Sequence, residues 1–254
     1  MNLVFEPFLL SLVAGMATGI GGLVAVLLGK LSDRVVGFSL GFASGVMLLV
    51  SFNNLFLEAV KLLTHFELIA MFSLGALIMV ALDLTIPHIE PIPHIELTAR
   101  RRGGNAETLR AGMLIAIGIT LHNLPEGLIV TAGYAYVPRL GLIIAIAIML
   151  HNIPEGVAIA ILLIAAGTKP SRTMTLTFLS GLAEPAAALV GVFVFSLLNQ
   201  SIIGYSLAFA AGVMTYITAD ELIPVAHEYG HKHTVSVALL LGIIFALLVD
   251  VILS

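Results

Sequence analysis

Residues 8–29 read FLLSLVAGMATGIGGLVAVLLG, a run of 22 residues without a charged side chain. Residues 35–57, VVGFSLGFASGVMLLVSFNNLFL, form a second uncharged run of 23 residues. A helix of about 20 apolar residues crosses the hydrocarbon core of a bilayer, whereas the strands of a membrane barrel alternate polar and apolar residues over shorter stretches. The two runs therefore predict an all-α membrane protein.

The composition of the whole chain agrees with this class. Of the 254 residues, 59% are hydrophobic and 10% are charged. A soluble domain has about a quarter of its residues charged. The absence of cysteine excludes disulfides, thiolate metal sites and cysteine nucleophiles, so any metal must be held by nitrogen and oxygen ligands. The net charge of −4 argues against a nucleic-acid partner.

We expect eight transmembrane helices, which together form one membrane domain over residues 1–254. Glycine, proline and charged residues separate the spans, and the one long hydrophilic connection covers residues 87–108. Because no targeting peptide precedes the first span, we expect the plasma membrane, or the inner membrane, of a prokaryotic cell. The expected spans are 7–29, 35–60, 67–86, 109–133, 140–167, 173–198, 202–224 and 234–252.

Lysine and arginine set the expected orientation of these spans. Nine of the eleven basic residues lie in alternate connections, and the other connections hold only Lys61 and Arg139. The positive-inside rule places the richer set in the cytoplasm. An even number of spans then puts both termini outside, on the extracellular or periplasmic side. The nine residues are Lys30, Arg34, Arg100, Arg101, Arg102, Arg110, Lys169, Arg172 and Lys232.

The same seven-residue phrase occurs in spans 4 and 5. Residues 121–127 read LHNLPEG, and residues 150–156 read LHNIPEG. Side chains three and four positions apart share one face of a helix, so each copy gathers its imidazole, amide and carboxylate on one side. These residues are His122, Asn123 and Glu126 in the first copy, and His151, Asn152 and Glu155 in the second.

Both glutamates of the repeated phrase are expected near the middle of the membrane. A charge there costs at least about 2.5–3.5 kcal/mol, and a lysine or arginine that could neutralise it is absent from both phrases. Two nearby carboxylates repel each other unless a cation lies between them, and a divalent metal ion would fill that role. The alternative is a structural pair of kinked helices joined by hydrogen bonds between histidine and glutamate.

Each phrase also contains a proline and ends in a glycine. Pro125 and Pro154 lack an N–H group and clash with the carbonyl four residues earlier, so each helix is expected to kink and to release carbonyl groups. Gly127 and Gly156 are expected to leave open space beside the carboxylates. In span 6, Glu184 would be a third carboxylate, enough to bridge two ions; the alternative is a protonated glutamate bonded to a neighbouring helix.

Other polar residues lie near the ends of spans 2, 3 and 7. At the outer end of span 2, Asn54 and Glu58 would form an access site or supply an extra ligand; the alternative is ordinary polar residues at the membrane interface. The inner ends of spans 3 and 7 would hold sites where the metal leaves, unless these are simply solvated loops. The inner candidates are Asp83, His88, Glu90, His94, Asp220, Glu221, His227 and His231.

These phrases resemble the ZIP (Zrt/Irt-like) family of divalent metal transporters, most closely its bacterial zinc-uptake branch. The resemblance covers nearly the whole chain and includes FSLGFASG at 38–45, SGLAE at 180–184 and DELIP at 220–224. It implies a bundle of three, two and three helices, with the first and last three related by an inverted repeat. It assigns the transported metal to His122, Glu126, His151 and Glu155. A second, adjacent site would use Asn123, Glu126, Asn152, Glu155 and Glu184.

The resemblance implies a secondary transporter that imports divalent metal ions, with Zn²⁺ first and Fe²⁺, Mn²⁺, Co²⁺ and Cd²⁺ as further substrates. Family members often carry an acidic or sulfur-bearing residue in span 2 where this chain has Asn53 and Asn54, so ligand type leaves the preferred metal open. No cofactor is expected beyond the transported metal. The expected partners are metal ions and the lipid bilayer, and the glycine-rich surfaces permit a homodimer. The alternative functions are an intramembrane zinc hydrolase, although the His-Glu-x-x-His phrase is absent, and a metal sensor.

Overall fold

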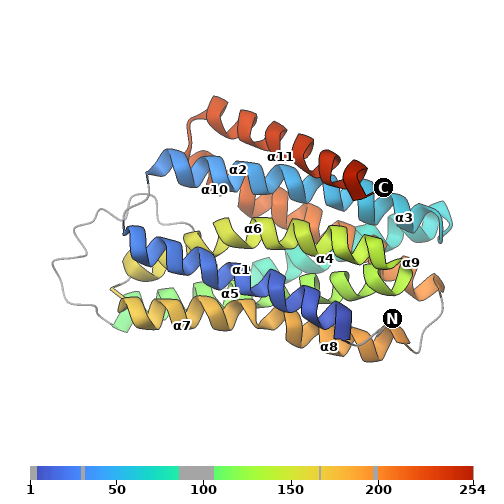
Figure 1. The fold of residues 1–254 in the computed structure, drawn as a ribbon, viewed down its shortest axis with the longest axis horizontal. Coiled ribbons are helices and arrows are strands. Elements are labelled where there is room, and N and C mark those ends of the chain that lie inside the picture. The colour runs from blue at the N-terminus through green and yellow to red at the C-terminus, as the bar shows by residue number, and fades with distance from the viewer. Residues whose placement is uncertain (1–4, 30–31, 86–105, 166, 197–199, 254) are drawn as a thin grey trace.

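The computed structural model describes residues 5–29, 32–85, 106–165, 167–196 and 200–253. Within these ranges the regular structure is entirely helical, which confirms the predicted all-α class. The long helices run side by side along one axis, and both chain ends lie at the same end of the bundle (Figure 1). The helices are α1 (Phe5–Leu28), α2 (Asp33–Leu49), η1 (Val50–Phe56), α3 (Leu57–Val60), α4 (His65–Thr85), α5 (Ala106–Tyr136), α6 (Pro138–Ala165), α7 (Pro170–Gly181), α8 (Ala183–Ser196), α9 (Gln200–Ile217), η3 (Thr218–Leu222), α10 (Ile223–Tyr229) and α11 (Lys232–Leu253).

Seven helical segments in the described part are long and apolar enough to cross a bilayer. The predicted fourth span, 109–133, lies within α5, but the side chains of much of its first half are outside the described part. These features are those of a multi-pass membrane protein. The seven segments are Phe5–Leu28, Asp33–Val60, His65–Leu84, Pro138–Ile161, Pro170–Phe195, Ser201–Tyr229 and Lys232–Leu253.

Three spans depart from the single straight helices that the sequence predicts. Span 6 is broken at Leu182, between α7 and α8. Pro185 explains the break, because its ring excludes the carbonyl of Gly181 from the helical pattern. Spans 2 and 7 each contain a π-helical segment, η1 and η3, and span 7 continues through α10 to Tyr229. By contrast, Pro125 and Pro154 lie inside helices that continue without a break.

Close glycine contacts define a first helix group, consisting of α1, α5, α6, α7 and α8. A Cβ atom on Gly15 of α1 would overlap the carbonyl oxygen of Gly181 on α7. A Cβ on Gly156 of α6 would overlap the carbonyl oxygen of Thr18 on α1. These helices therefore touch through their backbones, and the group packs as one unit.

A second helix group consists of α2, α4, α9 and α11, together with the short segments η1, α3, η3 and α10. Within it, α2 packs on α11 and α4 packs on α9. A Cβ on Gly45 would overlap the carbonyl of Leu239, and a Cβ on Gly212 would overlap the carbonyl of Phe72. A hydrophobic cluster of larger side chains joins the groups, for example Ile148 of α6 with residues of α2 and α9.

The second group contains an internal repeat with an offset of 167 residues. Position 45 is equivalent to 212, 75 to 242 and 83 to 250, and these pairs are glycine, glycine and aspartate in both copies. The packing follows the same offset, because Gly75 meets the carbonyl of Phe209 as Gly242 meets that of Phe42. Helices α2 and α9 run in opposite directions along the bundle (Figure 1), so the two copies are inverted. This arrangement agrees with the inverted repeat that the resemblance implied.

Candidate metal site

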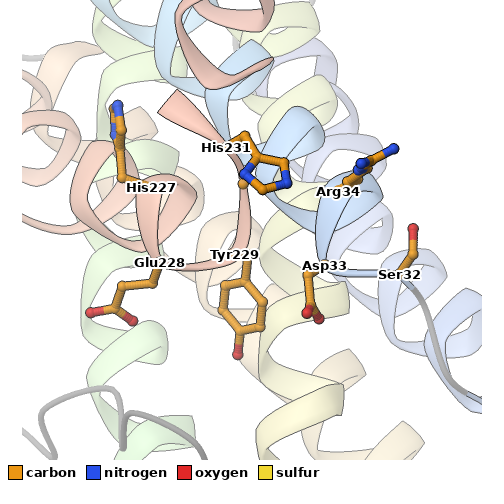
Figure 2. Close-up of a pocket in the computed structure, with 8 residues that line it drawn as sticks. Ser32, Asp33, Arg34, His227, Glu228, Tyr229 and His231 are labelled. Carbon is orange, nitrogen blue, oxygen red and sulfur yellow. The ribbon is translucent and has the colours of Figure 1, made fainter. Parts of the chain in front are cut away.

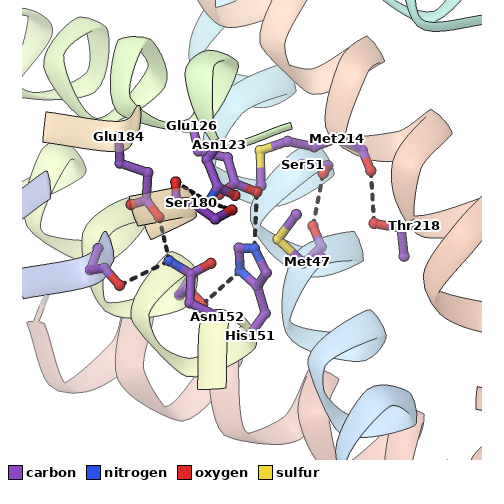
Figure 3. Close-up of polar contacts among 12 residues, drawn as sticks. Met47, Ser51, Asn123, Glu126, His151, Asn152, Ser180, Glu184, Met214 and Thr218 are labelled. Carbon is purple, nitrogen blue, oxygen red and sulfur yellow. Dashed lines mark hydrogen bonds and ion pairs between the residues drawn. The ribbon is translucent and has the colours of Figure 1, made fainter. Parts of the chain in front are cut away.

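The two copies of the repeated phrase lie on α5 and α6, which pack against each other in the first helix group. Four of their polar side chains, Asn123, Glu126, His151 and Asn152, are buried with Glu184 of α8 (Figure 3). Asn123, Asn152 and Glu184 have no exposed surface, and Glu126 and His151 are each 3% exposed. Five polar side chains from three helices, all of them candidate ligands, therefore meet in the interior.

Glu126 and His151 form the pair at the centre of this cluster. Nε2 of His151 lies 2.9 Å from Oε1 of Glu126. The other ring nitrogen, Nδ1, lies 3.3 Å from the carbonyl oxygen of Ala147, and since a carbonyl only accepts, Nδ1 carries a hydrogen there. A neutral imidazole would then point the lone pair of Nε2 at the carboxylate. The contact is favourable only with a proton, or in its place a metal ion, between the two atoms.

The two asparagines anchor the site to its surroundings through their amide N–H groups. Asn123 donates from Nδ2 to the carbonyl of Ser180 at 3.0 Å. Asn152 donates from Nδ2 to the carbonyl of Ala14 at 2.9 Å and to Oε1 of Glu184. In both residues the side-chain oxygen, Oδ1, is thereby turned away from these bonds and left as an acceptor.

Five buried oxygen atoms at this site have no hydrogen-bond donor among the described residues. They are Oδ1 of Asn123 and Asn152, and Oε2 of Glu126, Glu155 and Glu184. Leaving a buried acceptor unsatisfied costs about 1–3 kcal/mol, and more for a charged group. These five oxygens, which can only accept while the glutamates are ionised, are poorly satisfied as hydrogen-bond partners, but they are a suitable set of ligands for a cation.

The described side chains do not yet converge on a single point. No three histidine, aspartate or glutamate side chains in the described part lie close enough together to coordinate one ion. The side chain of His122, the remaining predicted ligand, lies outside the described residues. A metal ion would therefore have to separate Glu126 from His151 and draw neighbouring oxygens inward.

The glycines after the two glutamates serve packing rather than openness, contrary to our expectation. A Cβ on Gly127 would overlap the carbonyl of Glu184, and a Cβ on Gly156 would overlap that of Thr18. The space beside each glutamate is thus filled by the backbone of a neighbouring helix. These contacts hold α8 and α1 against the site and bring Glu184 within reach of Asn152.

Comparison with known proteins finds zinc transporters that are similar over most of the chain. The model of the family described as ZIP Zinc transporter matches residues 96–250. The zinc transporter ZupT of Chlorobaculum parvum is 37% identical over 242 residues, covering 89% of each chain. The ZupT proteins of Corynebacterium efficiens and Streptococcus mutans are 38% and 35% identical, and each match covers at least 90% of both chains.

The chain belongs to the ZIP zinc transporter family. It is therefore a transporter and not an enzyme, and the alternative of an intramembrane hydrolase has no support. In this ZIP protein, the repeated phrases lie where α5, α6 and α8 enclose the buried polar cluster.

The outer candidates of this ZIP protein, Asn54 and Glu58, are not part of the central cluster. Asn53 and Asn54 donate from Nδ2 to the two carboxylate oxygens of Asp250 on α11, at 3.1 and 3.3 Å. Glu58 instead forms a 2.6 Å ion pair with Lys61, and this hydrogen bond raises the pKa of the Lys61 ammonium. The role of Asp250 was missed, because nothing in the sequence places it beside span 2.

The inner candidates fall into two places. The Tyr216 hydroxyl donates to Asp83 Oδ2 at 2.7 Å and also interacts with Asp220, so one tyrosine joins two predicted carboxylates. Glu221 interacts electrostatically with Glu155 of the central cluster. This neighbour relation connects the buried site to η3, the segment that follows α9. The sequence did not identify Tyr216 as a partner of these carboxylates.

His227 and His231 line a separate pocket of about 550 Å³ between the start of α2 and the turn from α10 to α11 (Figure 2). Nδ1 of His227 is already bonded to the carbonyl of Ile223 at 2.8 Å, and the two imidazoles do not point at a common centre (Figure 2). The remaining candidates, His88, Glu90 and His94, lie outside the described residues.

Proposed function

We propose that this protein is a secondary transporter that imports Zn²⁺ into the cytoplasm through the buried cluster of α5, α6 and α8. The observation that carries the proposal is the set of five buried acceptor oxygens without donors. Such a set is costly when empty and favourable around a divalent cation. The ZupT relatives are named as zinc transporters, which supports zinc as the first substrate.

We assign two adjacent metal positions to the cluster. The first would be formed by His122, Glu126, His151 and Glu155. The second would be formed by Asn123, Glu126, Asn152, Glu155 and Glu184. Because Glu126 and Glu155 belong to both sets, two ions would share carboxylates and repel each other, which would speed the release of the first ion when the second arrives.

The direction of transport follows from the charge distribution. The proposed topology has eight spans, with both termini outside and the basic connections inside. A membrane potential that is negative inside favours the inward movement of a dication by about 4.6 kcal/mol per 100 mV. From the central cluster the ion would move past Glu221, a neighbour of Glu155, toward Asp83 and Asp220, which the proposed topology assigns to the inner side.

Alternating access would come from movement of the first helix group against the second. Every assigned ligand lies on α5, α6 or α8, so the site would travel with the first group. Backbone contacts at glycines hold each group together, whereas side chains such as Val46, Ile148 and Leu207 meet between the groups. A side-chain interface without interlocked backbones can slide with less disruption.

Uptake of radioactive zinc into proteoliposomes tests the proposal. The variants Glu126→Gln, which removes the negative charge at the same size, and His151→Gln, which removes the imidazole, should each reduce the initial rate at least tenfold, because each replaces a strong ligand with a neutral amide. Glu58→Gln is the matched control, since it neutralises a carboxylate outside the cluster. Unlabelled Fe²⁺, Mn²⁺, Co²⁺ and Cd²⁺ as competitors would rank the other proposed substrates. Binding of zinc without any flux through the parent protein would refute the transport proposal.

A homodimer is a separate proposal that rests on the small-residue faces of the helices. Cross-linking at low detergent concentration, followed by mass measurement, would detect it. A monomer that transports zinc at the full rate would exclude a functional requirement for the dimer.

A further inference from the structure

Arg139 makes a two-point contact with the end of α11. It lies in the first turn of α6, and its Nη2 nitrogen donates to the backbone carbonyl of Asp250 at 3.1 Å. The same nitrogen lies 3.5 Å from Oδ1 of the Asp250 side chain. The guanidinium group therefore touches a charged and a neutral oxygen of one residue, which gives the contact a defined geometry.

Asp250 is held in place by the second helix group. Asn53 and Asn54 of η1 donate to its two carboxylate oxygens at 3.1 and 3.3 Å. The Asp250 side chain is 24% exposed, so it is partly shielded from water. Such a carboxylate has little freedom to follow Arg139 if α6 moves, since two amides fix its position.

The Arg139–Asp250 contact crosses between the two helix groups. Arg139 belongs to the first group and Asp250 to the second. The interhelical bonds of Asn152, which reach α1 and α8, stay within the first group. The bond from Tyr216 to Asp83 stays within the second group. Movement of one group against the other would leave those bonds intact and would have to break the contact of Arg139.

The internal repeat places an aspartate at each end of the second helix group. Asp83 and Asp250 are equivalent positions, 167 residues apart, at opposite ends of the bundle. Asp83 accepts a hydrogen bond from Tyr216 of its own group, and Asp250 is contacted across the groups by Arg139. The Arg139 contact therefore joins the groups at the end where the chain begins and ends.

We propose that Arg139 and Asp250 form an outer latch, which holds the first and second helix groups together at the end where the chain begins and ends, and which must open before metal can reach the site from that side. The inference rests on the proposed function for its link to transport. The effect of the latch on the accessibility of a buried thiol can be measured without any metal.

The absence of cysteine makes an accessibility test direct. Ser51 is wholly buried on η1, the segment whose asparagines hold Asp250, so Ser51→Cys places a buried thiol in that segment. A membrane-impermeant maleimide would be applied to vesicles of known sidedness. His65→Cys, at an exposed position at the start of α4, identifies vesicles in which the latch end faces the reagent.

Opening the latch should accelerate labelling of the thiol in Ser51→Cys by about three- to tenfold, the range expected for a partly exposed charge-assisted contact. The variants that should open the latch are Arg139→Gln and Asp250→Asn, each made in the Ser51→Cys background. Exchanging the two charges, with Arg139→Asp and Asp250→Arg together, should return the labelling rate toward that of Ser51→Cys alone. Lys61→Gln is the matched control, because it removes an ion pair at the same end but within one helix. If Asp250→Asn fails to accumulate, Arg139→Gln alone decides the result.

An unchanged labelling rate in Arg139→Gln would overturn the latch, as would an equal increase in Lys61→Gln. Zinc uptake is measured on the same vesicles to separate the two proposals. Faster labelling in a protein that never takes up zinc would support the latch and refute the transport proposal. Normal zinc uptake with an unchanged labelling rate would support the transport proposal and refute the latch.

Discussion

At the scale of single residues, the asparagines of the two phrases are as informative as the charged residues. Asn123 and Asn152 use their N–H groups on carbonyls of α7 and α1, and this leaves each Oδ1 free inside the cluster. An amide that is fixed on one side and unsatisfied on the other is preorganised to accept a cation. The same bonds explain why an amide, with both donor and acceptor, is better suited to the position than a carboxylate.

Glu184 should determine whether the cluster holds one ion or two. In the Glu184→Gln variant, the side-chain oxygen can still accept the hydrogen bond from Asn152, but the charge is lost. We expect the stoichiometry of zinc binding, measured by isothermal titration calorimetry, to fall from two to one while the thermal stability changes little. Glu58→Gln should leave the stoichiometry unchanged. A value of two in Glu184→Gln would remove Glu184 from the second position.

At the scale of helices, the irregular segments carry the polar residues. The break at Leu182 precedes Glu184, η1 contains Asn53 and Asn54, and η3 contains the two acidic residues before Leu222. A π-helical turn shifts side chains around the helix axis relative to an α-helix, and such turns are frequent at functional sites. Runs of apolar residues predict where a helix crosses the membrane, but they carry no signal for this local change of winding.

Gly156 should be essential for the packing of α1 on α6. The Gly156→Ala variant would place a methyl group against the carbonyl of Thr18, so the two helices must separate. We expect a loss of about 1–3 kcal/mol or more in the free energy of unfolding, measured by thermal or denaturant unfolding in detergent. Gly191→Ala is the control, since its methyl group would meet the side chain of Thr131 at 3.0 Å, and its loss should be smaller. Equal losses would contradict this account.

At the scale of the whole molecule, the division into two helix groups predicts which cross-links stop transport. A bifunctional thiol reagent that joins Arg139→Cys to Asp250→Cys would tie the groups together and should abolish zinc uptake. Joining Asn53→Cys to Asp250→Cys should have little effect, because both residues belong to the second group. Uptake is compared before and after cross-linking in each double variant. Full uptake after linkage of Arg139→Cys to Asp250→Cys would show that the groups do not move at this end.

Much of the fold could be predicted from local features. The helix positions agree with the predicted spans within a few residues, except where Pro185 breaks span 6 and where α10 extends span 7. The buried cluster brings together five of the candidate ligands, and their role in binding metal stays a prediction. The partners of Asn54 and Asp83 could not be predicted, because Asp250 and Tyr216 are separated from them by most of the chain.

The sequence by itself determined the membrane class, the family and the candidate ligands, because a bilayer imposes the length of an apolar run and makes each buried charge conspicuous. The tertiary structure alone decided how those residues pair. Glu126 meets His151 of the other phrase, and Asn53 and Asn54 meet Asp250. These contacts depend on glycine positions where helix backbones touch, and on how the two helix groups lie against each other, neither of which a local pattern specifies.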